Sequence, residues 1–180
     1  VPTLTVGQDG NLYGTAGGQV FRIDQAGTYS TYITSVGGRA PRLVVGPDGF
    51  LYGFTGQTPY SFADPEPEAD HGVFFRLDYQ ANYTLLATLP HSIATDLLLG
   101  SDGAFYGGSA YEYWGDSAIN TTGMVKLTTT GAFTALGGNQ GVLSPVPQVV
   151  GSDGAIYGTR STQWGNPAQS SVFRLDTAGN

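Results

Sequence analysis

One short phrase, Gly-x-Asp-Gly-x-x-Tyr-Gly, occurs four times in this chain of 180 residues. The copies recur at intervals of about 40 to 55 residues, a period typical of one supersecondary unit per repeat. Such a chain builds its core by stacking the units, because one unit cannot bury its apolar face alone. The four copies are TVGQDGNLYGT at 5–15, VVGPDGFLYGF at 44–54, LLGSDGAFYGG at 98–108 and VVGSDGAIYGT at 149–159.

Each phrase predicts two β-strands joined by a tight turn. Asp-Gly between two β-prone runs is the strongest short-range hairpin signal, because tight turns require a positive φ. A third apolar run with a basic residue follows each phrase, and a fourth β-prone stretch follows three of them. We therefore expect four short antiparallel strands per unit, A to D in chain order, and no helix. The third runs are 20–24, 74–78, 124–128 and 172–176, and the fourth are 29–34, 83–89 and 133–136.

Repeated units of four short strands are typical of the blades of a β-propeller. We predict an all-β chain with four consecutive blades, namely blade 1 over 1–39, blade 2 over 40–93, blade 3 over 94–145 and blade 4 over 146–180. Blade 4 has no candidate for strand D, so we expect further blades or a second copy of the chain to complete the ring. A closed ring of four blades, a β-sandwich and a β-solenoid are the alternatives.

The pattern GSDGxxYGT followed by VFRLD resembles the tandem repeat of the GloVer family of bacterial proteins, named after Gloeobacter and Verrucomicrobia. All four repeats of the chain carry the resemblance. The pattern is more distantly similar to the repeats of streptogramin lyase-like propellers and of PQQ-type propellers. The resemblance implies a secreted or surface-displayed propeller, and it implies no particular activity.

Composition narrows the class of partners. The formal net charge is −7 and only 12% of the residues are charged, which argues against binding of nucleic acid or anionic membranes. The chain has no cysteine, which excludes disulfides and thiolate metal sites. Its richness in Gly, Thr, Ser and Tyr favours an extracellular or cell-surface bacterial protein. The first residue is Val1 rather than Met, so we expect a mature or excised segment.

The repeats differ most in the connection between strands B and C. This connection is short in blade 1, but insertions fill 55–72, 108–123 and 159–171 in the other blades. Long loops on a repeated scaffold are the usual place for function. Exposed aromatic rings beside polar groups suit stacking on sugars or docking of a protein, so we predict a binding or scaffolding module with a protein or carbohydrate partner. The candidate binding residues are Tyr60, Phe62, Tyr111, Tyr113, Trp114 and Trp164.

These aromatic side chains have an alternative role, which is to fold back and cover their own loops. We expect the segment 110–116 to project from the blade and to leave Trp114 partly exposed. Three aromatic residues within four positions do not follow strand alternation, and blade 1 folds without such an insertion.

Four carboxylates alternate along the segment ADPEPEAD of the second insertion. Carboxylate oxygens are suitable Ca²⁺ ligands, but the spacing of an EF-hand is absent and two intervening prolines favour an extended, solvated segment. We therefore predict no metal site. The weak candidates for one are Asp64, Glu66, Glu68 and Asp70.

The competing class of function is an enzyme, most plausibly a lyase or a hydrolase. Its acid–base groups would come from His71, His91 and Arg39, with a nearby glutamate such as Glu112. The spacing does not bring these groups together. The chain has no nucleophile elbow, metal motif or phosphate-binding loop, and we expect no cofactor.

Two residue types recur at fixed places in every repeat, which favours a role in the scaffold. We expect the basic residue of strand C to pair with an acid or a carbonyl group of the neighbouring blade, or to bury its stem between blades, and the tyrosine of the phrase to pack between blades. The basic residues are Arg22, Arg76, Lys126 and Arg174, and the tyrosines are Tyr13, Tyr52, Tyr106 and Tyr157.

Overall fold

All regular secondary structure in the described part of the chain is β-strand, which confirms the predicted fold class. The structure is a computed structural model, and the chain divides into two compact units, Val1–Ser92 and Ile93–Asn180. Because the described residues form no helix, none of them belongs to a helix that could cross a membrane. The structure describes residues 4–34, 36, 42–55, 72–89, 97–109, 123–138, 145–161 and 170–179.

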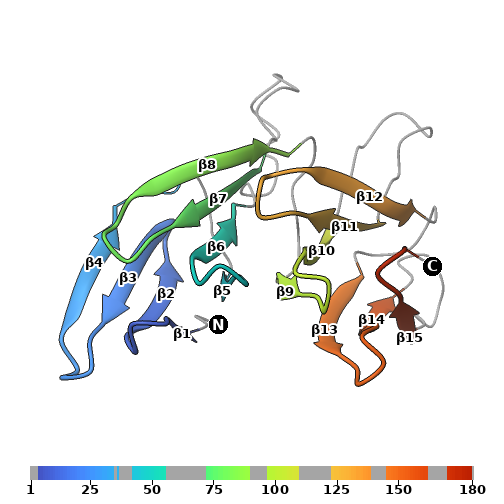
Figure 1. Cartoon of the computed structure of the whole chain (residues 1–180), viewed down its shortest axis with the longest axis horizontal. Helices are drawn as coiled ribbons and strands as arrows, with labels where there is room; N and C mark the ends of the chain where they lie inside the picture. Colours follow the sequence, from blue (N-terminus) through green and yellow to red (C-terminus); the bar gives the residue numbers. More distant parts are fainter. Residues whose placement is uncertain are drawn as a thin grey trace. The chain divides into compact units, whose positions relative to one another are not determined.

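Each repeat forms one antiparallel sheet in which the strands pair in chain order (Figure 1). The first unit holds two four-stranded sheets. The strands of the first are β1 (Leu4–Val6), β2 (Leu12–Ala16), β3 (Gln19–Ile23) and β4 (Tyr29–Ile33). The strands of the second are β5 (Leu43–Val45), β6 (Leu51–Phe54), β7 (Val73–Leu77) and β8 (Tyr83–Thr88).

The second unit holds one sheet of four strands and one of three. The first consists of β9 (Leu98–Leu99), β10 (Phe105–Ser109), β11 (Gly123–Leu127) and β12 (Phe133–Gly138). The second consists of β13 (Val146–Val150), β14 (Ile156–Ser161) and β15 (Ser170–Leu175). The prediction of four strands in three blades and three strands in the last is confirmed for the described residues.

The core of each unit lies between its two blades. In the first unit, Tyr13 and Val20 of blade 1 share one buried cluster with Leu43 and Phe75 of blade 2. Strand β1 also contacts β5, the strand at the same place in the next sheet. Packing of this kind buries apolar surface that a single sheet leaves exposed, so it stabilises the repeat only when blades stack.

The second unit repeats this arrangement. Tyr106 and Met124 of blade 3 pack with Ile156 and Leu175 of blade 4. The expected packing of the recurring tyrosines between blades is therefore confirmed for Tyr106, as it is for Tyr13 in the first unit.

Candidate functional site

The antiparallel strand order gives each blade two different ends. The A–B and C–D turns lie at one end, here called the turn end, and the B–C connection lies at the other, here called the loop end. The recurring phrase forms the turn end, and the insertions that the sequence singles out belong to the loop end.

The A–B turn is a three-residue loop rather than a two-residue Asp-Gly turn. In blade 1 the Gly7 N–H donates to the carbonyl of Asn11 at 2.8 Å, and the Gly10 N–H donates to the carbonyl of Gly7 at 3.0 Å. Gly10 has a φ of 79°, so only the last loop residue is left-handed. The same pair of hydrogen bonds closes the turns that begin at Gly46, Gly100 and Gly151.

The aspartate of the phrase holds the turn and the following strand together. In blade 3, Asp102 Oδ1 accepts the backbone N–H of Ala104 at 3.1 Å, and Asp102 Oδ2 accepts the Tyr106 hydroxyl at 2.9 Å. Hydrogen bonds to a carboxylate are stronger than those between neutral groups. We call this arrangement the Asp–Tyr clamp. It recurs as Tyr13–Asp9 at 2.8 Å, Tyr52–Asp48 at 2.7 Å and Tyr157–Asp153 at 3.0 Å.

The first glycine of the phrase is required by the same clamp. A Cβ on Gly100 would lie 2.6 Å from Tyr106 Cε2 and 2.9 Å from Asp102 Oδ1, closer than non-bonded atoms approach. Tyr106 is fully buried and cannot move aside. The phrase thus forms one local structure. Its glycine leaves room for the buried tyrosine ring, and its aspartate and tyrosine make the hydrogen bonds that hold the turn to the strand.

The clamp contacts shift the pKa values of Asp102 and Tyr52 in opposite directions. Burial alone raises the pKa of Asp102, but hydrogen bonds from Lys126, Ala104 and Tyr106 outweigh it and hold that pKa below its ordinary value. Burial and the bond to Asp48 raise the pKa of Tyr52 to about 12. Both shifts favour the ionised carboxylate and the neutral phenol at neutral pH.

The recurring basic residue binds the aspartate of its own phrase in blades 3 and 4. Lys126 Nζ lies 2.7 Å from Asp102 Oδ2 and also donates to the Thr177 carbonyl of blade 4 at 3.2 Å, which confirms the expected contact between blades. Arg174 likewise pairs with Asp153 of its own blade at 3.0 Å. Arg76 lies over the Phe50 ring, 4.6 Å from its centroid.

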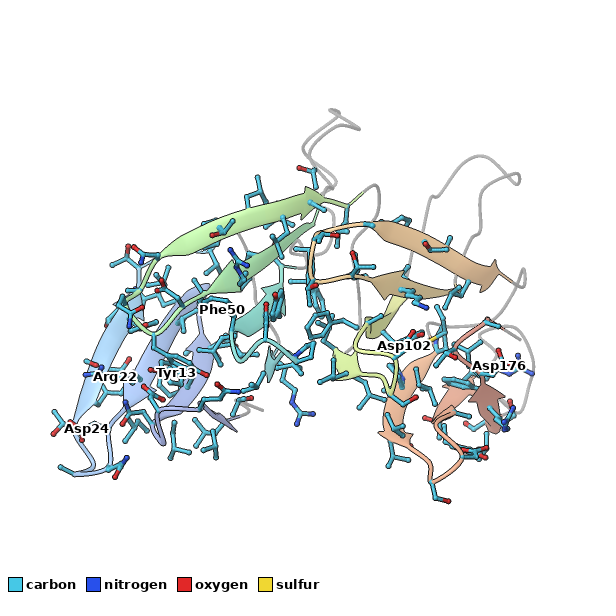
Figure 2. All side chains as sticks on the ribbon, viewed as in Figure 1. Tyr13, Arg22, Asp24, Phe50, Asp102 and Asp176 are labelled. Carbon is cyan, nitrogen blue, oxygen red and sulfur yellow. The ribbon has the colours of Figure 1, made fainter. Side chains whose placement is uncertain are left out.

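Arg22 of blade 1 differs from these three. It lies beside Tyr13 on the neighbouring strand (Figure 2). Its Nε is buried and has no hydrogen-bond partner among the described residues. Nothing in the described part of the chain explains this buried donor.

The loop end contains connections of very different length. In blade 1, Gly17 and Gly18 have φ values of 59° and 80° and close a two-residue turn between β2 and β3. The blade fold is therefore complete with a minimal B–C connection. The insertions of the other three blades are not needed for strand pairing.

The insertion of blade 2 starts and ends at one fixed point. The Thr55 N–H donates to the carbonyl of Val73 at 2.8 Å, and the Val73 N–H donates to Thr55 Oγ1 at 3.0 Å. Thr55 is 1% exposed, and the carbonyl of Gly72 accepts the N–H of Leu89 at 2.7 Å. Thr55 and Val73 thus form a hydrogen-bonded base at the two ends of the insertion 56–71.

The candidate site residues of the sequence all lie outside the described residues, so the structure tests none of them. Sequence reasoning missed the Asp–Tyr clamp, although its signal is present: the aspartate and the tyrosine stand four residues apart in every phrase. Among the described residues, no group of three or more His, Cys, Asp or Glu side chains could hold a metal ion. The untested residues are Arg39, Tyr60, Phe62, Asp64, Glu66, Glu68, Asp70, His71, His91, Tyr111, Tyr113, Trp114 and Trp164.

Comparison with known proteins defines the fold class. The chain is similar to a streptogramin B lyase, with a TM-score of 0.63 and 16% identity over 98% of this chain and 51% of that one. It is similar to a gluconolactonase from Xanthomonas campestris, with a TM-score of 0.57 and 13% identity over 93% of this chain and 59% of that one. The PQQ-bound aldose sugar dehydrogenase from Streptomyces coelicolor gives a TM-score of 0.57 and 14% identity over 88% of this chain and 55% of that one.

These likenesses and the four sheets show that the chain has the fold of the β-propeller class, with a three-stranded last blade. Identities this low show the fold alone. The chain spans little more than half the length of these structures. No model of a known protein family matches the chain and no curated protein does, so the resemblance to the GloVer repeat stays a prediction.

Proposed function

We propose that this chain is a binding or scaffolding module of a secreted or cell-surface bacterial propeller, and that the loop end is its contact face. The observation that carries the proposal is the difference between the two ends. Local hydrogen bonds occupy the turn end in every blade, whereas the loop end needs only the two-residue turn of Gly17 and Gly18. Insertions that the fold does not require are the usual carriers of function.

The chemistry of the insertions supports a protein or carbohydrate partner. They hold both tryptophans of the chain, Trp114 and Trp164, beside other aromatic and polar residues. Aromatic faces stack on sugar rings and anchor protein interfaces. The net charge of −7 disfavours polyanionic partners.

A glycan array and a capture experiment with proteins of the source's cell surface test this proposal. We expect a bound glycan or protein, and at least a tenfold loss of affinity in Trp114→Ala or Trp164→Ala. The matched control is Tyr29→Ala, which removes an aromatic side chain that is 60% exposed on the outer strand β4, far from any insertion in sequence. Equal affinity in all three variants contradicts the proposal.

A propeller enzyme is the second candidate, because the solved structures with this fold include a lyase and a gluconolactonase. The groups proposed for acid–base chemistry are His71 and His91. The test is turnover of a streptogramin B and of gluconolactone by the wild-type chain and by His71→Ala and His91→Ala. Turnover that either variant abolishes, with unchanged folding, favours the enzyme over the binding module.

A further inference from the structure

One face of blade 4 is exposed at a position that is buried in every other blade. The position lies in strand C, two residues before the recurring basic residue. Its side chain is 0% exposed in Val20, 0% in Phe74 and 5% in Met124, but 73% exposed in Val172. Val149 on β13 is a second exposed apolar side chain of the same blade, at 55%. We call Val149 and Val172 the forward face of blade 4.

A second face is exposed on blade 1. Leu4 pairs with Gly14 in the register in which Leu43 pairs with Gly53 and Pro147 pairs with Gly158. Leu43 is 1% exposed and Pro147 is buried, whereas Leu4 is 48% exposed. Val6, two residues along the same strand, is 61% exposed. We call Leu4 and Val6 the backward face of blade 1.

The interfaces inside the two units show what covers these positions. In the first unit, Val20 of blade 1 shares a buried cluster with Leu43 of blade 2, and the Thr5 hydroxyl donates to the carbonyl of Leu43. The position of Val172 in one blade therefore shares a buried cluster with the position of Leu4 in the next. The forward and backward faces are the two halves of a contact that the fold already makes.

In the second unit, two side chains of blade 3 donate hydrogen bonds to carbonyl groups of blade 4. The Ser101 hydroxyl donates to the Gly154 carbonyl at 2.9 Å, and Lys126 Nζ donates to the Thr177 carbonyl at 3.2 Å. The equivalent donors on blade 4 are Ser152 and Arg174. The Arg174 side chain is 51% exposed, so its guanidinium, which binds Asp153, can also donate to a further acceptor, as Lys126 does.

We propose that the forward face of blade 4 binds the backward face of blade 1 in a second copy of this chain. This occupant is chosen because one chain carries both halves of the contact, with apolar side chains and donors in matching places. In the complex, Ser152 donates to the carbonyl of Gly10 of the partner subunit, and Arg174 donates to that of Gln25 of the partner subunit. The two faces differ, so the contact is head to tail, and each copy can take part in two of them.

This interface lies on the sides of the blades and not at the loop end, so it stands independently of the proposed ligand binding. Sedimentation of the chain over a range of concentrations tests it. We expect an apparent mass that rises with concentration above that of one chain, and at least a tenfold weaker association in Val172→Asp. Because Val172 is 73% exposed, the variant keeps its fold, which the thermal melt verifies. The control Leu85→Asp, at a residue 53% exposed on the outer strand β8, leaves the association unchanged.

Two single-cysteine variants identify the halves. The chain has no cysteine of its own, so Val172→Cys and Leu4→Cys each carry one thiol. After mixing and oxidation we expect a disulfide between the two variants in preference to either homodimer. A monomer at all concentrations, or equal cross-linking in all combinations, overturns the proposal. So does an intrachain disulfide in a monomeric variant with both cysteines, which would show a closed ring of four blades.

Discussion

The turn end and the loop end of each blade are built from the same strands but are constrained in opposite ways. At the turn end, the clamp from Asp102 to Tyr106 and the missing Cβ of Gly100 account for three of the invariant positions of the phrase. At the loop end, blade 1 closes with two glycines, and the base at Thr55 and Val73 carries a long insertion in blade 2. The comparison shows that one end of the blade is fixed in every copy, whereas the other end is free to differ in length.

The largest effect is expected for Gly100→Ala at the turn end. The new Cβ would meet the ring of Tyr106 and the carboxylate of Asp102, and overpacking of this kind destabilises by about 3 kcal/mol. Urea denaturation measures the loss. The control is Gly17→Ala at the loop end, where nothing lies within 4 Å of the added Cβ and only the left-handed backbone costs about 1 kcal/mol. Equal losses of unfolding free energy in the two variants would show that the turn end is no more constrained than the loop end.

A smaller effect is expected for Tyr106→Phe. The change removes the hydroxyl that donates to Asp102 and leaves the buried ring in place. Loss of one hydrogen bond to a charged group destabilises by about 1.5 kcal/mol. Tyr29→Phe, at a side chain that is 60% exposed, is the control and should change the free energy of unfolding by less than about 0.5 kcal/mol.

The pH dependence of stability sharpens the account of the clamp. Hydrogen bonds outweigh burial and hold the pKa of Asp9 and Asp102 below the ordinary value of 3.8. The two ionised carboxylates therefore stabilise the folded state fully above pH 3.8, and this stabilisation is lost as the pH falls through their folded-state pKa. The urea midpoint of the wild type should therefore fall as the pH is lowered below 4. The midpoint of Asp102→Asn should fall less steeply. An acid limb of unchanged slope in this variant would contradict the role of Asp102.

The tyrosine of the clamp predicts how the stability of the fold changes at alkaline pH. The pKa of Tyr52 is raised to about 12 from its ordinary value of 10. A raised pKa stabilises the folded state below pH 10, and this stabilisation is lost as the pH rises towards 12. Absorbance of the ionised phenol, followed together with unfolding, should show Tyr52 titrating late in the wild type. In Asp48→Asn the titration should move to lower pH.

The smallest effect on stability is expected at the loop end. Replacing residues 56–71 with a single glycine, which then precedes Gly72, copies the two-glycine connection of blade 1 and leaves the base at Thr55 and Val73 intact. Loop closure depends only weakly on length, so the free energy of unfolding should change by less than about 1 kcal/mol. A loss as large as that of Gly100→Ala would show that the insertion belongs to the fold, and would remove the basis for placing the contact face there.

The sequence alone determined the repeat, the number and order of the strands, and the missing strand of blade 4. It could do so because alternating apolar runs and Asp-Gly turns are local signals, and four copies of each reinforce one another. It also identified the recurring tyrosine and basic residue as parts of the scaffold. The expected contact of the basic residue with the neighbouring blade is confirmed for Lys126, which donates to the Thr177 carbonyl. Arg174 binds Asp153 of its own blade.

Only the tertiary structure decided which atoms make the clamp, which loop residue is left-handed, and which copies of one position are buried. Val20 and Val172 occupy the same place in nearly identical strands, VFRID and VFRLD, yet one is 0% and the other 73% exposed. No local pattern separates them, because burial depends on whether the next blade is packed against the strand. The same reason limits prediction of contacts to the side chains within one repeat, whereas contacts between repeats depend on how the blades stack.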